Sequence, residues 1–532
     1  MYKIGVIYSL IYLFMIYSQF HVILILTKIN TKGIPMKTRH FHSLLSLVTA
    51  SLLLAACGSS DPGTAPATDT AEQTAPAAAD TAVTETTVDP RYADAIGSHD
   101  FGGEDFHFLL CGDGDPYNWS EIDVLSEGET GETINDGIYA RNLALEERLN
   151  IKITGLFDMN ATTTLTKTVS AGDDAYDAAW LRLDAAGPAA QTGAVYDWHD
   201  VPQVDLTKAY WDQSIIRDLS IGGKVYYLTG DISTIDNQAT WIMMFNKNMV
   251  NEYDMEDPYT LVRDGKWTLD KFSEMTKDIA RDINGDGKYT IDDMYGLSTT
   301  IDTIYGLFYS TGLSFISKDS DDLPYFDLDM QKAQDVLERT AEIFNEGNRT
   351  LVASRITSQT SDVISGIRQA FFEDRALFYA EVMFHVANLR QMETDFGIIP
   401  QPKYDEAQKD YITFVNPAGS CLTVPITVGN VEQSGIVLEA MASESYRHLT
   451  PAYYNTALQQ KYTRDDESAE MLDLLLQNRV YDLAMIYSWG NINANYRSLA
   501  DKNDTDLSSL VAKREKQVVS GIEKFLAAFE TE

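Results

Sequence analysis

The chain lacks most of the motifs that mark an enzyme or a zinc protein. Its 532 residues include only three cysteines and eight histidines. No cysteines or histidines have zinc-ligand spacing, and no HExxH or GxSxG motif is present. The nearest stretch to a GxxxxGK[ST] loop, SIGGKV, lacks its first glycine. No order of Ser, His and Asp stands out as a catalytic triad, so the sequence favours a protein that carries no chemistry of its own.

Cysteine is too scarce for a disulfide framework. Cys57 follows an apolar segment, which leaves Cys111 and Cys421 for the rest of the chain. Each lies in an apolar, strand-like run, FHFLLCG or GSCLTVPI. We therefore expect two buried free thiols rather than a bridge.

Positive charge is also in short supply. The chain has 41 Lys and Arg against 79 Asp and Glu, a formal net charge of −38. Nucleic acids and anionic membranes are bound through basic faces, so charge alone favours neither partner. With so many carboxylates, no single Asp–Glu pair indicates acid–base catalysis. Hydrophobic residues make up 44% of the sequence, and a chain of this length predicts two domains or one two-lobed unit.

A secretory signal begins at Met36. In MKTRHFHSLLSLVTASLLLAAC, Lys37 and Arg39 precede an apolar run that ends at Ala56. The last four residues, LAAC, resemble the lipobox of bacterial lipoproteins, which implies that Cys57 is the lipidated residue after cleavage. The alternatives are an ordinary signal beside a stray cysteine, or an apolar helix that is retained. The run is shorter than the roughly 20 residues that a membrane span requires.

Residues 1–35 hold a second apolar segment, IGVIYSLIYLFMIYSQFHVILIL, which is long enough to span a bilayer. Two hydrophobic segments before one lipobox are unusual for export. We interpret residues 1–35 as an upstream start before the true first residue, Met36, with an additional membrane segment as the alternative. Residues 36–56 are then the signal peptide.

After Cys57 the composition changes to Ala, Thr, Pro and acidic residues, as in GSSDPGTAPATDTAEQTAPAAADTAVTETTVDP. This stretch has no aromatic residue and no periodicity, so it cannot bury enough apolar area to offset the loss of conformational entropy. We expect a disordered tether over residues 57–97. A lipid and a tether predict a folded body held at the extracellular face of the cell membrane.

From about residue 98, short apolar runs alternate with helical segments. DFHFLLCG predicts a strand, TINDGIYARNLALEERLNIKIT a helix that leads into a strand, and TTLTKTVSAGDDAYDAAWLRLD a helix, a turn and a strand. Such alternation predicts β-α-β units and a mainly parallel sheet. In WTLDKFSEMTKDIAR, Leu269, Phe272, Thr276 and Ile279 share one helix face, and Thr268 is placed to cap the helix.

Several stretches then follow one another in a characteristic order. They are SAGDDAYDAAWL, SIGGKVYYLTGDIS with WIMMFNKNMVNEY, GKWTLDKFSEM, DFGIIPQPKYD, NPAGSCLTVPITVGNVEQSGIVLEAMAS and LTPAYYNTALQQKYTRDDESAEMLDLL. In order and spacing they resemble the extracellular solute-binding proteins (family 1) of bacterial ABC importers, particularly the carbohydrate-binding group related to maltose-binding protein. The resemblance covers nearly all of residues 98–532, and no single stretch is diagnostic by itself.

The resemblance implies an α/β fold of the periplasmic-binding-protein-like type II, with two α/β lobes joined by a multi-crossing hinge. The ligand is then enclosed in the cleft between the lobes, where hinge closure removes water. Asn246-Lys247 resembles the mark of the first crossover. The implied division is 98–245 plus 412–450 for lobe 1, and 246–411 plus 451–532 for lobe 2.

A sugar-binding cleft needs flat aromatic surfaces for C–H faces and polar side chains for hydroxyl groups. Several segments offer that mixture where the family lines its cleft, and AAWLRLD ends a predicted strand at the edge that faces ligands. Each aromatic has the alternative of a place in the core, and each charged residue that of a solvated or paired group. The candidate ligand residues are Trp180, Arg182, Asp184, Asp231, Tyr305, Glu381, Phe384, Trp489 and Asn491.

The segment DINGDGKYTIDD has the spacing of an EF-hand calcium loop. Its oxygen ligands are Asp282, Asn284, Asp286, Thr290 and Asp293, with Lys288 contributing its backbone carbonyl and Gly287 the turn. Position 12 is Asp instead of the usual Glu, and the alternative is a polar turn. MYGLSTT does not predict the exit helix of a calcium sensor, so we expect Ca²⁺ as a structural ion.

The resemblance implies a monomeric, lipid-anchored substrate-binding protein, not an enzyme. It would capture a carbohydrate, in particular an oligosaccharide, and deliver it to the permease subunits of an ABC transporter. The alternatives are a ligand-sensing partner of a membrane receptor and a surface glycoside hydrolase, which would need two carboxylates roughly 5–10 Å apart. The residues do not identify the sugar and leave a peptide or another polar solute open.

Overall fold

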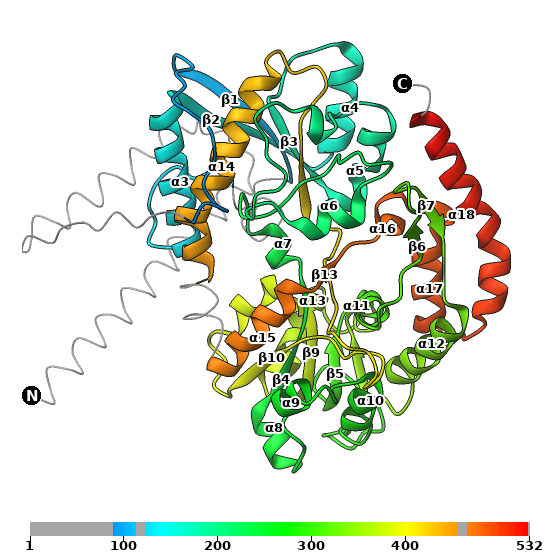
Figure 1. Cartoon of the computed structure of the whole chain (residues 1–532). Coiled ribbons are helices and arrows are strands. Elements are labelled where there is room, and N and C mark those ends of the chain that lie inside the picture. The colour runs from blue at the N-terminus through cyan, green and yellow to red at the C-terminus, as the bar shows by residue number, and fades with distance from the viewer. Residues whose placement is uncertain (1–88, 113–123, 455–464, 530–532) are drawn as a thin grey trace, which may run out of the picture. The chain divides into compact units, whose positions relative to one another are not determined.

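The computed structural model describes residues 89–112, 124–454 and 465–529 (Figure 1). Thr86–Glu532 forms one compact unit. The predicted membrane segment, the signal peptide, Cys57 and most of the predicted tether lie outside the described residues. None of the described helices is both long and apolar enough to cross a bilayer.

The first lobe is built on a four-stranded sheet with the order β12-β3-β1-β2. Its strands are β1 (Glu104–Cys111), β2 (Ile151–Asp158), β3 (Ala178–Arg182) and β12 (Ser420–Thr423). β1 is parallel to β2 and β3, while β12 is antiparallel to β3. The parallel pairing predicted from the alternation of strands and helices is confirmed in this lobe, and β12 shows that the chain returns to it.

Helices cover this sheet. They are α3 (Thr133–Leu149), α4 (Ala161–Ala171), α5 (Leu183–Gln191), η1 (Trp198–Asp200), α6 (Gln213–Leu219), α7 (Ile235–Gln238) and α14 (Val431–Pro451). α3 and α14 lie side by side (Figure 1). Arg141 on α3 is fully buried and donates to the carbonyls of Ile232 and Val124 at 2.9 and 3.1 Å. Its hydrogen bonds tie the helix to two neighbouring loops and compensate the burial of the charge.

The second lobe contains a five-stranded sheet with the order β10-β4-β9-β5-β8. Its strands are β4 (Trp241–Asn246), β5 (Tyr295–Thr299), β8 (Thr350–Val352), β9 (Ala376–Val382) and β10 (Phe396–Ile399). β5 is parallel to β8 and β9, but β4 is antiparallel to β9 and β10. The prediction of a mainly parallel sheet is therefore wrong here, because the strand that enters this lobe runs against its neighbours.

The elements around this sheet include the helix that the sequence predicted to begin after Thr268. They are α8 (Lys247–Glu252), α9 (Pro258–Arg263), α10 (Leu269–Lys277), α11 (Thr303–Ser310), the hairpin of β6 (Ile316–Lys318) and β7 (Pro324–Phe326), α12 (Met330–Asn345), η2 (Ala353–Arg355), α13 (Val363–Phe372) and η3 (Met383–Leu389). The Thr268 side chain accepts a hydrogen bond from the N–H of Lys271 at 3.3 Å, so the predicted cap is confirmed.

The first crossover lies earlier than the predicted boundary at residue 245. β4 consists of six buried residues, WIMMFN, in the middle of the second sheet. Asn246 ends this strand and caps α8, since its side chain accepts a hydrogen bond from the N–H of Met249 at 2.9 Å. The mark Asn246-Lys247 therefore follows the first strand of lobe 2 instead of preceding it.

The C-terminal elements contact both lobes, which differs from their predicted assignment to lobe 2 alone. They are α15 (Asp466–Gln477), β13 (Arg479–Val480), α16 (Leu483–Tyr487), η5 (Trp489–Asn491), α17 (Ile492–Asp501) and α18 (Leu507–Phe529). α15 packs on β10, α17 packs on α12, and α16 packs on α5 of the first lobe. β13 pairs in parallel with β11 (Thr413–Phe414), so two of the segments that cross between the lobes are held together.

Residues 89–97, which we call the N-terminal strap, are packed against the first lobe. The ring of Tyr92 stacks on that of Tyr446 on α14, with centroids 3.6 Å apart. Arg148 on α3 donates to Asp94 at 2.6 Å and to the carbonyl of Ile96 at 2.7 Å. The predicted tether is therefore too long at its C-terminal end, because Tyr92 and Ile96 supply apolar surface that the preceding residues lack.

The two remaining cysteines are buried, and neither is part of a disulfide, as predicted. Cys111 ends β1. Cys421 lies in β12, opposite Leu181 of β3. β3 lies between these strands, so the two backbones are about 9.5 Å apart at the usual strand spacing. A disulfide needs Cα atoms within roughly 7 Å, which the sheet does not allow.

Candidate ligand cleft

A cavity of about 340 Å³ lies between the lobes. It is lined by residues of the first lobe, of the second lobe and of the segments that connect them. They are Arg182, Asp184, Trp241, Asp302, Tyr305, Phe414, Asn416, Pro417, Ala418, Met485, Ser488, Asn493 and Arg497. Three predicted ligand residues, Arg182, Asp184 and Tyr305, are therefore brought together.

The wall on the first lobe is formed where β3 runs into α5. The guanidinium of Arg182 donates to both carboxylate oxygens of Asp184, at 3.1 and 2.7 Å. The N–H of Asp184 donates to the carbonyl of Pro417 at 2.7 Å, which fixes the start of α5 against a returning segment of the chain. Arg182 also lines a smaller cavity of about 200 Å³ beside the start of α4. The Arg182–Asp184 pair is thus a bidentate, partly exposed ion pair at the carboxyl end of a strand.

The wall on the second lobe carries a second ion pair. Asp302 precedes α11 and bonds to Arg497 of α17. The guanidinium carbon of Arg497 lies 5.3 Å from the ring centroid of Tyr305, a distance at which a cation is attracted to an aromatic face. Burial raises the pKa of Tyr305 to about 12, so its hydroxyl stays protonated at neutral pH. One face of this tyrosine is therefore covered by protein and is not free to stack on a sugar.

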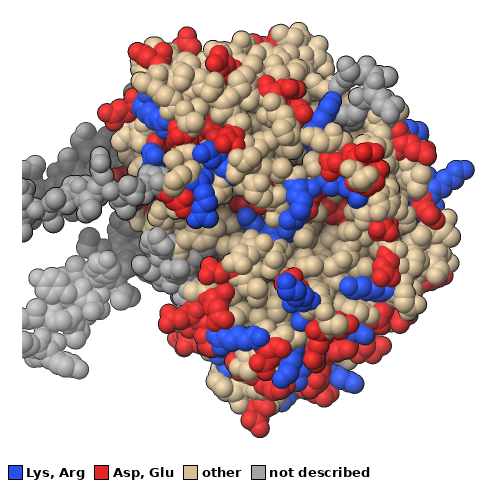
Figure 2. All heavy atoms as spheres, viewed as in Figure 1, with Lys and Arg blue, Asp and Glu red and all other residues tan. Residues whose placement is uncertain are grey.

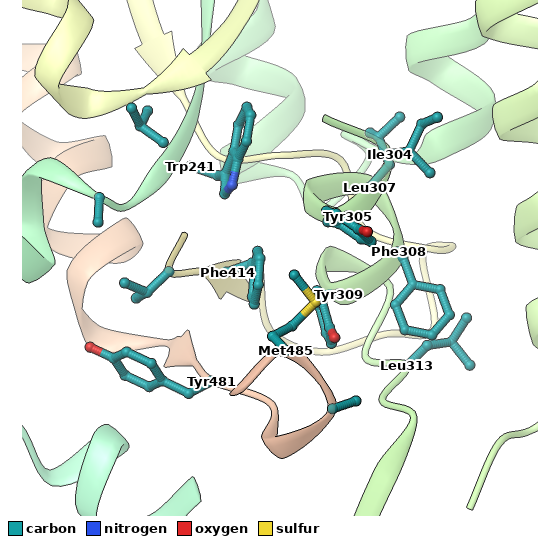
Figure 3. Packing of buried hydrophobic residues seen from close by; sticks show 14 of the residues in the cluster. Trp241, Ile304, Tyr305, Leu307, Phe308, Tyr309, Leu313, Phe414, Tyr481 and Met485 are labelled. Atoms are coloured by element: carbon teal, nitrogen blue, oxygen red, sulfur yellow. The ribbon is translucent and has the colours of Figure 1, made fainter. Parts of the chain in front are cut away.

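Apolar side chains from three parts of the chain form the floor. Trp241, Phe414 and Met485 lie around the same space as Tyr305 (Figure 3). The ring of Phe414 stacks on that of Tyr309 with centroids 4.2 Å apart, which packs the floor of the cavity against α11. On the face in Figure 2, Lys and Arg side chains gather in the hollow across the middle, whereas Asp and Glu side chains dominate below it. The local charge in the hollow thus differs from that of the acidic chain as a whole.

Four of the other candidate residues lie in packed surroundings or at the surface. Trp180 is 3% exposed in the core of the first lobe, between Leu110 and Leu422 of the neighbouring strands. Trp489 stacks on Tyr487, with centroids 5.0 Å apart.

Phe384, at the start of η3, packs against a hydrophobic cluster formed by residues of both lobes and lies edge-on to His385. Asn491 is exposed and adopts a left-handed backbone conformation, with φ of 51°. None of these four side chains lines the cavity between the lobes.

Asp231 lies beside a buried charge network at the hinge. Arg479 of β13 pairs with Asp212 at 3.1 Å and with Asp236 of α7 at 2.9 Å. Burial raises the pKa of Asp231 to about 7, and the charge of Asp236 adds to this effect, while Arg479 opposes it. Burial also raises the pKa of Asp236 in spite of Arg479. The network joins the first lobe to two of the crossing segments.

Glu381 is buried near the end of β9 in the second lobe. Burial raises its pKa to about 7, although the N–H of Val382 donates to it at 2.9 Å and Thr300 also hydrogen-bonds to it. Burial lowers the pKa of the nearby His385 to about 4. At neutral pH the histidine is neutral, so the two side chains do not form a full ion pair across their 3.8 Å separation.

The predicted calcium loop is a turn closed by its own side chains. Both oxygens of Asp282 accept backbone N–H groups, from Gly285 and Gly287, each at 2.7 Å. Asp293 is 1% exposed and accepts three hydrogen bonds, from the N–H of Ile283 and from the N–H and hydroxyl of Thr290. Burial would raise the pKa of Asp293, but these bonds outweigh it and hold the pKa below its ordinary value.

The described residues contain no group of three or more His, Cys, Asp or Glu placed to hold a metal ion. Asp282 keeps lone pairs for a cation, whereas Asp293 is largely used by the protein. The calcium site stays a prediction.

Comparison with known proteins finds matches for the fold but not for the sequence. No family model matches the sequence, and no curated protein is similar to it. Among solved structures, a cyclo/maltodextrin-binding protein complexed with maltotetraose matches with a TM-score of 0.50 at 13% identity, over 82% of this chain and 99% of that one.

Two further structures match at the same TM-score of 0.50. An ABC substrate-binding protein from Listeria monocytogenes in complex with cycloalternan is 11% identical over 80% of this chain and 99% of that one. UspC from M. tuberculosis is 13% identical over 78% of this chain and 100% of that one. This chain has the fold of these proteins. The predicted periplasmic-binding-protein-like α/β fold is confirmed.

Sequence analysis missed most of the lining residues. Asn493 and Arg497 are four positions apart on α17 and so share a helix face. This spacing could have indicated that the two residues line the same site. Asp302 lies one turn before Tyr305. Trp241, Phe414 and Met485 gave no such signal, because an apolar residue in a strand or helix predicts a core equally well.

Proposed function

We propose that this protein captures a carbohydrate, in particular an oligosaccharide, in the cleft between its lobes and delivers it to an ABC permease. In this proposal Cys57 carries a lipid that holds a monomeric protein at the extracellular face of the membrane. The protein acts by binding alone, and Ca²⁺ in the loop that starts at Asp282 is structural.

The observation that carries the proposal is the cavity lined by both lobes at the segments that connect them. A ligand that touches both walls favours the closed state through its greater affinity for that state. Closure gives a membrane partner a signal that the protein is loaded. The shared fold with proteins that were crystallised with maltotetraose and cycloalternan supports a glycan as the ligand.

The test is a thermal-shift screen of the purified full chain against oligosaccharides, peptides and other polar solutes. A ligand at 100 times its Kd adds about 2.7 kcal/mol to the free energy of unfolding. We expect a shift with at least one glycan and recovery of that glycan unchanged after incubation. A shift with peptides alone would overturn the proposed ligand while leaving the fold in place.

The same screen addresses the two alternatives. Asp184 and Asp302 line opposite walls, so a glycoside hydrolase would have carboxylates available, and conversion of the bound glycan would reveal one. A ligand-sensing role would be revealed by capture of a receptor instead of permease subunits when the loaded protein is cross-linked on cells.

A further inference from the structure

Among the described residues that line the cleft is a buried polar side chain whose hydrogen-bonding capacity is partly unused. Asn493 is 6% exposed and lines the cavity. Its Nδ2 lies 3.1 Å from the sulfur of Met485, a weak acceptor, and its Oδ1 has no hydrogen-bond partner among the described residues. A buried polar group without a partner costs free energy, roughly 1–3 kcal/mol, so the position calls for a group from outside the protein.

The chemistry of the missing partner follows from the amide. As assigned, Oδ1 needs a donor; with the amide turned over, the NH₂ group would need an acceptor. A hydroxyl group satisfies either orientation, because it both donates and accepts. A carboxylate or an ammonium group satisfies only one of them.

The charges around the cavity are balanced in pairs. Arg182 is held by Asp184, and Arg497 is held by Asp302, so the four charged lining residues carry no net charge. Both pairs are partly exposed, so each still contacts water. A carboxylate on the ligand would meet the two aspartates as well as the two arginines, and an ammonium group would meet the arginines as well as the aspartates. Neither charge finds a net opposite charge in the cavity that could compensate for its loss of water.

We propose that the cleft selects an uncharged sugar unit, and that Asn493 is the specificity residue that binds one of its hydroxyl groups. The proposal rests on the proposed function, since it assigns the class of sugar that the same cleft accepts. Arg182, Asp184, Asp302 and Arg497 provide paired donors and acceptors for the remaining hydroxyls while excluding ligands with a net charge.

The first test uses matched sets of sugars with the full chain, purified in a detergent without a sugar headgroup. Each set holds an uncharged hexose, disaccharide or oligosaccharide, its counterpart with a carboxylate at C6, and its counterpart with an amino group at C2. The sets cover the gluco, galacto and manno configurations. By calorimetric titration, we expect at least one uncharged member to bind about tenfold or more tightly than its charged counterparts.

The second test replaces Asn493 and measures two quantities. Asn493→Leu removes the unused polar group, so the ligand-free protein should unfold at the same or a higher temperature. The same variant should bind the uncharged sugar about tenfold more weakly, because a ligand hydroxyl loses its partner. Asn495→Leu is the control on the same helix: Asn495 bonds to the carbonyl of Asn491 and to Arg514, outside the cavity lining, and its replacement should leave the affinity unchanged.

The outcomes separate this proposal from the function on which it rests. A uronate or amino sugar that binds as tightly as its uncharged counterpart overturns the selectivity and leaves carbohydrate capture standing. An Asn493→Leu protein that is less stable but binds normally shows a structural role and overturns the assignment of Asn493. If no sugar in any set binds, the proposed function fails, and the inference fails with it.

Discussion

Replacing Arg479 by Met should destabilise the protein strongly and make its stability depend on pH. The guanidinium pairs with Asp212 and Asp236, whose side chains are 4% and 2% exposed, and its own side chain is 11% exposed. Removing one partner of a buried ion pair typically costs about 3–5 kcal/mol, because the other charge stays buried without compensation. We expect a loss of that size at about pH 8.

The sign of the pH dependence follows from the direction of the pKa shifts. Arg479 opposes the burial that raises the pKa values of Asp231 and Asp236, so its removal raises both further above the ordinary value of 3.8. A carboxyl whose pKa is higher in the folded than in the unfolded state takes up a proton on folding. Its contribution to stability is complete below pH 3.8 and is lost as the pH rises through the folded pKa. The deficit of Arg479→Met should therefore be smaller at about pH 5, by roughly 1.4 kcal/mol for each unit by which one pKa rises.

The assay is urea unfolding followed by tryptophan fluorescence at both pH values. Arg217→Met is the matched control, because Arg217 pairs with Asp218 while its side chain is 60% exposed. Exposed pairs contribute at most about 1 kcal/mol, so the control should change little at either pH. Adding Asp236→Asn to Arg479→Met should restore part of the lost stability. A deficit below about 1 kcal/mol, or one that is equal at both pH values, would refute the reasoning.

Three further predictions concern other parts of the molecule. Glu439 is 1% exposed and accepts hydrogen bonds from Tyr210 and Trp211, and burial raises its pKa to about 7. As the pH rises from about 4.5 to 7, the Glu439→Gln variant should therefore gain up to roughly 3 kcal/mol of stability relative to the native protein in urea titrations. Parallel stability profiles of the two proteins would contradict this. A chelator should lower the thermal midpoint without abolishing glycan binding, and Asp282→Asn should remove that response; an unchanged midpoint would identify the loop as a polar turn. Gly435→Ala should cost about 1–3 kcal/mol in urea unfolding, since a Cβ there would lie 1.8 Å from the carbonyl oxygen of Pro202, whereas Gly128→Ala meets no atom within 4 Å and should be neutral.

Some local elements of both lobes could be predicted from sequence because their signals are local. The strand at FHFLLC, the helix that begins at Thr133 and the cap at Thr268 depend on periodicity and on single hydrogen bonds between near neighbours. Strand direction in the second sheet was not accessible in this way. β4 is buried on both faces, so its sequence is a continuous apolar run whether its partners are parallel or antiparallel.

The candidate site was only partly predictable for a related reason. Arg182 and Asp184 could be placed because polar residues at the carboxyl end of a strand have few other roles. Trp180 is two residues before Arg182 on the same face of β3, but it lies further from the end of the strand, where both faces are buried. Asp231 and Glu381 gave the same signal as a ligand residue, but groups near them in space, Arg479 and Thr300, come from other segments. Only the fold brings such partners together.

The N-terminal strap determines where a pull on the preceding chain would enter the folded unit. Tyr92, Asp94 and Ile96 are held by α14 and α3, two helices of the same lobe, and Lys208 adds a bond to the carbonyl of Ala93 at 2.8 Å. A load on residue 89 would therefore be borne by the first lobe, and the second would feel it only through the crossing segments. If a lipid on Cys57 holds the chain, as in the proposed function, the first lobe is the half fixed to the membrane, and closure of the cleft would move the second lobe relative to it.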